Sequence, residues 1–318
     1  MPITVLAAAL ATLAATPVTL PAGPPVSMDY VAMDAAHHRM WAPAGNTGSI
    51  YVLDGEKVLT IGGQPTAPSP RPGRPNMGAS SVTVAGDRVY VGNRADQSVC
   101  AFGAVKLDKL GCVAVGSKPD GVAWVGATRE IWVTTPADKS LTVIDPASGK
   151  HNAIKLEGDP EGLVVDDAAG LFYTNYEDLD RTLAVDVKTH KIVGNWPTGC
   201  GPEGPRGLAL DAKRHFLFAG CGAGGAVAFD THGGRELARL STAGGVDNID
   251  FADGWLFVAS GKDGLLTIAR VADDGKLTTI GTARTGEGAR AVVAGGGIAY
   301  VADSRGGKIW VVKLPAQK

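Results

Sequence analysis

The chain has 318 residues, and its 30 Lys and Arg nearly balance its 32 Asp and Glu, so the net charge is close to neutral. No basic run stands out, which argues against a nucleic-acid-binding protein or one held on an anionic membrane. With 44 glycines, 19 prolines and 45% hydrophobic residues, the composition is that of a folded protein rich in turns.

The first feature in chain order is an uncharged apolar run from Ile3 to Ala15. It is too short to span a bilayer and has the length of a signal-peptide core. Ala14 and Ala15 suit a signal peptidase, although no Lys or Arg precedes the run. We therefore expect residues 1–15 to be a signal peptide and the protein to be exported, either periplasmic or secreted. Residues 16–318 are then expected to form one domain without a membrane span.

Seven similar units follow along the rest of the chain. Each opens with a turn and a short apolar run, as in KPDGVAWV at 118–125 and DPEGLVVD at 159–166. The runs begin near Tyr30, Ser81, Gly121, Gly162, Gly207, Asn248 and Arg290, at spacings of 51, 40, 41, 45, 41 and 42 residues. The long first interval contains a proline-rich insert at 62–78, which we expect to form a surface loop.

Each unit contains short, β-branched, alternating stretches separated by Gly, Asp and Asn, a pattern that predicts strands. The second stretch carries an aromatic residue in every unit, at Trp41, Tyr90, Trp132, Phe172, Phe218, Phe257 and Tyr300. A repeat of about 40 residues with four strands is typical of a β-propeller blade. The predicted fold is therefore an all-β, seven-bladed β-propeller with four antiparallel strands in each blade.

The ends of the chain predict how the ring closes. The last unit stops after its third strand, KIWVV at 308–312, and PVTL at 17–20 precedes the first unit. Pairing Pro17–Leu20 beside Ile309–Val312 would complete the last blade and remove a free sheet edge.

Two sets of motifs resemble a known family. FYTN at 172–175 and VYVGN at 89–93, with the third strands and PxG turns that follow, resemble YVTN β-propeller repeats. YVADSRGGKIWVV at 300–312 is similar to an NHL-type repeat. The resemblance implies a WD40-like propeller, and such propellers include sensors, binding proteins, lactonases and quinoprotein-type enzymes.

Strand alternation assigns the connecting loops to two faces. Loops from fourth to first strands and from second to third strands share one face, which the resemblance implies is the binding face. The six histidines fall in turns of the opposite face, at His37, His38, His151, His190, His215 and His232. Because CxxCH and HExxH are also absent, we expect no covalent haem and no histidine-based centre at the channel.

Four cysteines in an exported chain indicate disulfides. Cys100 and Cys112 fall in the third and fourth strands of the second unit, where they would face each other across a hairpin. Cys200 precedes the first strand of the fifth unit and Cys221 ends its second strand, on the same face. We predict the pairs Cys100–Cys112 and Cys200–Cys221.

Charged residues recur just before the first strand of successive units. The aligned positions are Asp29, Ser80, Asp120, Glu161, Arg206, Asp247 and Ala289, with Asn248 and Arg290 beside them. Repulsion among four carboxylates is costly unless arginines or a cation offset it. In a structural interpretation, Arg206 pairs with Glu161 or Asp247, and Arg290 pairs with Asp247 or Asp29. In a functional interpretation, the mouth is a polar pocket that favours a cation or a basic group, and Glu161 is the best single candidate.

The candidate binding residues at the channel mouth are Asp29, Asp120, Glu161, Arg206, Asp247, Asn248 and Arg290. Oxygen atoms of these acids, and of Asn93, Asn175, Asn248 and Asp303 at strand ends, are of the kind that Ca²⁺ takes. The candidate metal ligands are Glu161, Asp120, Asp247 and Asn175. No lactonase metal motif is matched residue for residue, so no catalytic residue is assigned.

Three functions remain open from the sequence. The first is an exported, monomeric, non-catalytic propeller that binds a protein partner or a small ligand at the channel mouth, and no nucleic acid. The second is a hydrolase of lactone or ester bonds in which a bound divalent cation such as Ca²⁺ polarises the carbonyl. The third is a quinoprotein-like oxidoreductase.

Overall fold

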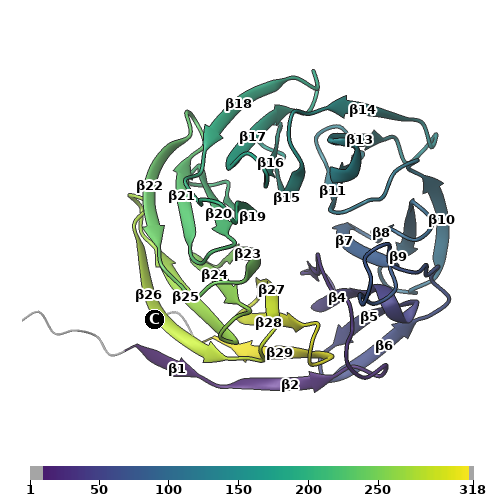
Figure 1. The fold of residues 1–318 in the computed structure, drawn as a ribbon, viewed down its shortest axis with the longest axis horizontal. Coiled ribbons are helices and arrows are strands. Elements are labelled where there is room, and N and C mark those ends of the chain that lie inside the picture. The colour runs from purple at the N-terminus through teal and green to yellow at the C-terminus, as the bar shows by residue number, and fades with distance from the viewer. Residues whose placement is uncertain (1–9, 315–318) are drawn as a thin grey trace, which may run out of the picture.

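The computed structural model describes residues 10–314, and residues 1–9 and 315–318 lie outside that range. Seven sheets stand side by side in a ring around a central axis, as Figure 1 shows. The described helical segments are two 3₁₀ turns, Gly45–Thr47 and Pro136–Asp138. The insert at 62–78 is a largely exposed loop with one bridge between Ala67 and Met77. The predicted all-β, seven-bladed propeller is confirmed.

Each blade is one antiparallel sheet whose strands follow one another outward from the channel (Figure 1). Blades one and two contain β3 (Ala32–Asp34), β4 (Arg39–Ala44), β5 (Ser49–Asp54) and β6 (Lys57–Ile61), then β7 (Ala79–Ala85), β8 (Arg88–Asn93), β9 (Ser98–Gly103) and β10 (Lys109–Ala114). Blades three and four contain β11 (Val122–Val125), β12 (Glu130–Thr135), β13 (Ser140–Ile144) and β14 (His151–Lys155), then β15 (Pro160–Asp166), β16 (Leu171–Tyr176), β17 (Arg181–Asp186) and β18 (Ile192–Pro197).

The remaining blades follow the same order. Blades five and six contain β19 (Pro205–Asp211), β20 (Phe216–Cys221), β21 (Ala226–Asp230) and β22 (Arg235–Leu240), then β23 (Val246–Ala252), β24 (Trp255–Ser260), β25 (Leu265–Val271) and β26 (Leu277–Arg284). Blade seven combines β27 (Ala289–Gly295), β28 (Ile298–Asp303) and β29 (Lys308–Lys313) with β2 (Ala15–Thr19) from the other end of the chain.

The ring closes as the sequence predicts. Strand β2 runs antiparallel to β29, with Pro17 opposite Trp310 and Val18 opposite Ile309. Leu20, just after β2, is 1% exposed and belongs to the apolar cluster between blades seven and one. Strands β2 and β29 therefore lie side by side in Figure 1, and β2 completes the seventh blade.

An additional strand lies within the segment expected to be a signal peptide. Strand β1 (Ala11–Leu13) pairs in parallel with the outer edge of β26, with Ala11 opposite Gly281, so blade six has five strands. A Cβ atom at residue 281 would lie 2.9 Å from the carbonyl oxygen of Ala11, so a glycine there favours the close approach. The sequence analysis did not predict this strand, because three residues of an apolar run carry no alternation signal.

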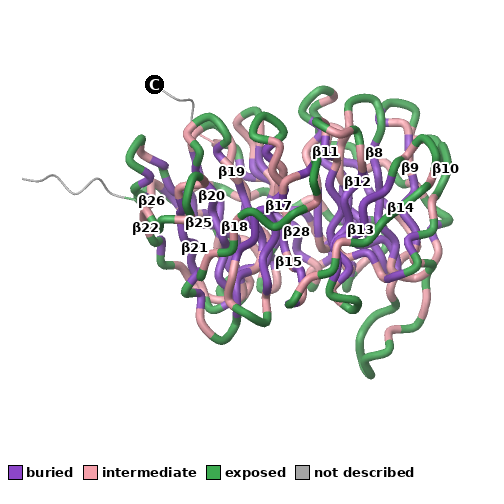
Figure 2. The backbone as a smooth tube through the Cα atoms, turned by 90° about the horizontal axis from the view of Figure 1, so that it is seen from above, coloured by how far each residue is buried: buried purple, intermediate pink, exposed green. Residues whose placement is uncertain are grey.

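The aromatic residues of the second strands pack between neighbouring blades. Trp41 is fully buried and packs in a cluster with blade-two residues such as Val82 and Val89. The rings of Trp132 and Phe172, from blades three and four, have centroids 4.9 Å apart. Figure 2 shows the buried strands enclosed by exposed turns on both faces. The aromatic column is core packing, a type of contact that contributes about 0.5–1.5 kcal/mol per pair beyond area burial.

Both predicted disulfides are present. Cys100 and Cys112 lie opposite each other on β9 and β10 and are bonded. The bond between Cys200 and Cys221 ties the segment before β19 to the end of β20. Two disulfides indicate an oxidising compartment. Within residues 10–314, no helix has the length and apolar character needed to cross a bilayer.

We predict that the closing strand contributes strongly to stability. Val18 is half-buried against the cluster between blades seven and one, whereas Thr19 on the same strand is exposed. Val18→Asp should lower the free energy of unfolding by about 2 kcal/mol or more, because it places an unpaired charge against apolar side chains. Deleting residues 16–20 should lower it further, since the deletion opens the ring.

Chemical denaturation followed by circular dichroism tests this prediction. Thr19→Asp is the matched control and should change stability by about 0.5 kcal/mol or less. A Val18→Asp variant or a deletion that unfolds at the same denaturant concentration as the parent would show that closure does not depend on β2.

Candidate functional site

β-bulges interrupt the innermost strands of five blades at the mouth. In blade four, β15 and β16 pair Glu161 with Asn175 and Leu163 with Thr174, so Gly162 is an extra residue on the inner strand. Similar register shifts interrupt the innermost strands of blades two, five, six and seven. A bulge redirects the side chains beside it. Here the bulge lets one polar residue face the channel, although the other side chains of the strand pack between blades.

The pairing register identifies which mouth residues are equivalent. In every blade, one residue of the innermost strand lies opposite the aromatic residue of the second strand, and the mouth position comes three residues earlier. The seven mouth positions are Asp29, Ser80, Asp120, Gly162, Arg206, Asp247 and Arg290. The sequence alignment had placed Glu161 and Ala289 in this ring, one residue early, because spacing alone does not locate a bulge.

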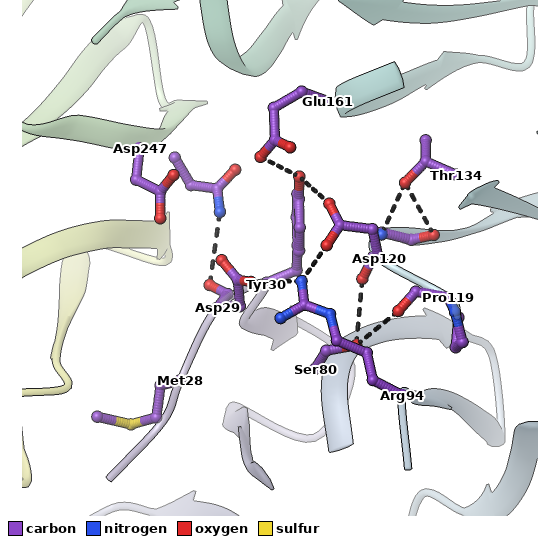
Figure 3. Close-up of polar contacts among 12 residues, drawn as sticks. Met28, Asp29, Tyr30, Ser80, Arg94, Pro119, Asp120, Thr134, Glu161 and Asp247 are labelled. Atoms are coloured by element: carbon purple, nitrogen blue, oxygen red, sulfur yellow. Dashed lines mark hydrogen bonds and ion pairs between the residues drawn. The ribbon is translucent and has the colours of Figure 1, made fainter. Parts of the chain in front are cut away.

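Tyr30 spans the channel just behind this ring (Figure 3). Its hydroxyl lies 3.0 Å from Glu161 Oε1 and 3.3 Å from Asp120 Oδ2, and it accepts the backbone N–H of Gly162 at 3.0 Å. Tyr30 is 9% exposed, and its hydroxyl reaches from blade one to the backbone of Gly162 in blade four. The sequence analysis used Tyr30 only to mark the start of a strand and missed this role.

Arg94 is a second residue that the sequence analysis missed. It follows β8, and its Nη2 atom lies 2.7 Å from Asp29 Oδ2 and also contacts Asp120 Oδ1. Burial raises the pKa of Asp120, and the adjacent Arg94 guanidinium partly offsets that shift. One arginine from a loop therefore bridges two acids of the mouth ring and offsets part of their charge.

The predicted arginine pairs are partly correct. Arg290 Nε lies 3.1 Å from Asp247 Oδ2, one of the two pairings expected. Arg206 instead pairs with Glu177 Oε1, at 2.5 Å, and not with Glu161 or Asp247. The reason is that Glu177 follows β16 on the neighbouring blade, whereas the carboxylate of Glu161 lies toward Tyr30. Within residues 10–314, Glu161 forms no ion pair closer than 4.0 Å.

The amide candidates are occupied by other contacts. Asn175 donates to the carbonyl oxygen of Arg206 at 2.5 Å and accepts from Thr182 Oγ1 at 2.6 Å. Asn248 donates weakly to the carbonyl oxygen of Asp29, at 3.4 Å. The side chains of Asn93 and Asp303 form hydrogen bonds with backbone groups of nearby loops. Among the residues that the structure describes, no group of three or more His, Cys, Asp or Glu is arranged to hold a metal ion.

Electrostatics distinguish Glu161 from the other acids. Burial raises the pKa of the half-buried Glu161 well above its usual value, and Asp120, Asp247 and Asp29 raise it further. The pKa of Asp247 rises to about 6, mainly through burial, with Arg290 opposing the shift. When Glu161 is protonated, it donates to Tyr30, and Tyr30 donates to Asp120, so each donor has an acceptor. Glu161 is the acid in this cluster whose charge the protein compensates least.

A pocket of about 350 Å³ opens beside these acids, over blades five to seven. Its cationic walls are Arg206, Lys262, Arg290 and Arg305. Its acidic walls are Glu203, Asp247 and Glu287. Glycines form much of the remaining surface, and their backbones are linked across blades by hydrogen bonds such as Gly245 N–H to Gly222 O at 2.9 Å. The pocket is therefore polar, and it is lined by charges of both signs.

A further acid lies in the channel wall, three residues beyond the mouth position of blade six. Asp250 Oδ2 accepts the backbone N–H of Ala294 in blade seven at 2.7 Å. At the equivalent position of blade two, Thr83 Oγ1 accepts the N–H of Trp124 in blade three at 3.2 Å. Both side chains connect neighbouring innermost strands. Burial raises the pKa of Asp250 to about 7.

Neither a protein-family model nor a curated protein matches the sequence. Virginiamycin B lyase from Staphylococcus aureus is similar in structure, with a TM-score of 0.75 and 13% identity over 95% of this chain and 99% of its own. A chain of the mitotic checkpoint complex has a TM-score of 0.76 and 11% identity over 99% of this chain and 96% of its own. The WD40 repeats of RRP9 have a TM-score of 0.76 and 12% identity, covering 96% of this chain and 100% of theirs.

At these identities the likeness shows the fold alone. The similar structures are seven-bladed β-propellers, and they include an enzyme and a component of a protein complex. The fold therefore does not distinguish catalysis from binding, and only the chemistry of the residues at the mouth can do so.

We predict that the Tyr30 hydroxyl stabilises the ring. Tyr30→Phe leaves the N–H of Gly162 and the carboxyl of Glu161 without their shared partner, so the free energy of unfolding should fall by about 1–3 kcal/mol. Tyr300→Phe, which removes a hydroxyl from the aromatic column between blades, is the control and should cost less. Equal stability of Tyr30→Phe and the parent in denaturant titrations would contradict the assigned contact.

We also predict a pH dependence that originates at Asp250. A carboxyl with a raised pKa in the folded protein binds its proton more tightly there than in the unfolded chain, so its ionisation weakens the fold. The contribution of Asp250 to the free energy of unfolding should therefore fall as pH rises from near 3.8 to about 7.

Asp250→Thr tests this with a side chain that the protein already uses at the equivalent position of blade two. Relative to the parent, the variant should gain at least about 1 kcal/mol of stability between pH 4 and pH 8. Denaturant unfolding measured at several pH values gives the comparison. A difference between variant and parent that stays constant with pH would contradict the assignment.

Proposed function

We propose that this protein is a non-catalytic propeller that binds a small polar ligand, or a charged segment of a protein partner, at the channel mouth. The supporting observation is that Glu161 is a half-buried carboxyl with a raised pKa and no ion pair within residues 10–314, and that Asp247, which lines the charged pocket, contributes to that shift. Groups kept in unfavourable electrostatic surroundings are concentrated at functional sites. A ligand with a basic group would supply the charge that the protein leaves uncompensated.

Binding is favoured over catalysis by the chemistry at the mouth. General acid–base and nucleophilic catalysis need a group oriented by a partner toward a reacting atom. Five of the six histidines lie in turns on the opposite face, and the sixth, His151, begins β14 on that face. The mouth acids contact Arg94, Arg290 and Tyr30. These contacts fix the acids in place within the ring.

A Ca²⁺-dependent hydrolase is the second candidate, because an excess of carboxylates also favours a divalent cation. Of its expected ligands, Glu161 and Asp120 lie on either side of the Tyr30 hydroxyl, and the amide of Asn175 is bonded within the protein. These contacts would have to break for the three residues to share one ion, which makes this candidate the weaker of the two.

We propose further that the chain is a divergent YVTN- or NHL-type propeller, exported as a monomer after removal of residues 1–15. The motifs at 172–175 and 300–312 and the two disulfides support this proposal. Cleavage after Ala15 would remove β1 from the edge of blade six. It would leave Thr16–Thr19 paired with β29, so the ring would remain closed.

Glu161→Gln tests the binding function, because it keeps the shape of the side chain and removes its charge. In a thermal-shift screen of small charged compounds and CaCl₂, we expect a polar ligand to raise the Tm of the parent and not that of Glu161→Gln. The Tm of the unliganded variant should stay the same or rise slightly, since Glu161 holds no ion partner. Glu177→Gln, which does remove the ion partner of Arg206, is the control and should lower the Tm modestly.

Two results would contradict this proposal. If Glu161→Gln and Asp120→Asn both destabilise the ring and every ligand of the screen binds as before, the mouth is structural. If protein purified without chelator carries stoichiometric Ca²⁺ that Glu161→Gln loses, the hydrolase becomes the better description.

A further inference from the structure

We propose that the mouth pocket takes a small zwitterion, with its cationic group directed inward to Asp247 and Glu161 and its anionic group at the outer rim. This inference rests on the proposed binding function and specifies the chemical class of the ligand. It follows from the distribution of charge with depth, which three observations establish.

The first observation is the inner layer of charge. Five carboxylates lie there with two arginines, and the members are Asp29, Asp120, Glu161, Glu177, Asp247, Arg94 and Arg206. Asp120 and Asp29 have side chains that are 13% and 20% exposed, so water screens them weakly, whereas Glu177 is 36% exposed. The inner layer therefore favours a positive group and repels a negative one.

The second observation is the outer rim of the pocket. Arg290, Lys262 and Arg305 have side chains that are 51%, 60% and 75% exposed, and they share the rim with two acids. Lys262 lies 3.4 Å from Glu203, and Arg305 lies 3.2 Å from Glu287. Exposed ion pairs of this kind contribute about 0–1 kcal/mol each, so a ligand anion can replace either acid at little cost. The rim therefore favours a negative group.

The third observation is the residue that joins the two layers. Asp247 lines the pocket, is 12% exposed, and is close enough to the inner acids to share their electrostatic effects. Its Oδ2 atom lies 3.1 Å from Arg290 Nε but is buried without a well-aligned hydrogen-bond donor. A ligand ammonium or guanidinium group at the inner end of the pocket would supply that donor.

The size of the pocket limits the ligand. A volume of about 350 Å³ lies at the lower end of the range of small-molecule sites, roughly 300–1,000 Å³. Tyr30 reaches from blade one to Gly162 in blade four, beside the inner acids Asp120 and Glu161. These dimensions suit a compact molecule with two opposite charges separated by a short spacer. A singly charged molecule would pair with opposite charges in one layer and would be repelled by like charges in the other.

Isothermal titration calorimetry with three probes of equal chain length tests the charge requirement. The probes are ε-aminocaproate, which carries both charges, caproate, which is only anionic, and hexylammonium, which is only cationic. At neutral pH and low ionic strength, we expect ε-aminocaproate to bind at least about tenfold more tightly than either singly charged probe.

Two variants test the orientation. Lys262→Gln should weaken ε-aminocaproate about three- to tenfold and leave hexylammonium unchanged, because it removes charge only at the rim. Glu161→Gln should weaken ε-aminocaproate and hexylammonium and leave caproate unchanged. Lys213→Gln, in an exposed turn of the opposite face, is matched to Lys262→Gln and should change none of the three.

Several outcomes would overturn the inference. Caproate binding as tightly as ε-aminocaproate would make the pocket an anion site, and equal binding of hexylammonium would make it a cation site. Failure of all three probes to bind would overturn the proposal that the ligand is a zwitterion. If the thermal-shift screen still finds a ligand that Glu161→Gln loses, the proposed binding function stands without it, and if the screen finds none, both proposals fail.

Discussion

Seven innermost strands have to converge on one axis, and the close approach of their backbones at the mouth governs most of this structure. A side chain at Gly162 would overlap the carbonyl oxygen of Arg206, and one at Gly207 would overlap the backbone of Asn248. Bulges take up the extra length where the strands crowd together. In blades five to seven the bulges hold Arg206, Asp247 and Arg290, so the packing constraint also contributes to the charged mouth.

Repeat spacing predicted the fold because every blade repeats the same local pattern. Strand alternation, one aromatic residue per second strand and a missing last strand are each readable without knowing any long-range contact. The disulfides were predictable for the same reason, since Cys100 and Cys112 lie across one hairpin. The seven-bladed ring, its closure by β2 and both cysteine pairs were therefore correct in detail.

The candidate site was predictable only in part, because its contacts join blades that are distant in the sequence. Tyr30 meets Gly162 across 132 residues, and no local pattern indicates that its side chain spans the channel. Arg94 lies in a loop whose direction depends on the neighbouring blade. The register of Glu161 depended on a bulge, and the partner of Arg206 proved to be Glu177, an acid outside the motif. The aligned motif indicated that acids and arginines gather at the mouth, and only the three-dimensional structure shows which of these charges remain uncompensated.

The position of Tyr30 affects whether solutes can pass through the centre of the ring. In a ring-shaped protein, solutes could in principle pass along the central axis from one face to the other. The phenol of Tyr30 crosses the centre of the ring and is bonded to Glu161 and Gly162 in blade four. A solute moving along the axis between the mouth and the histidine-bearing face would have to pass this side chain or displace its hydrogen bonds.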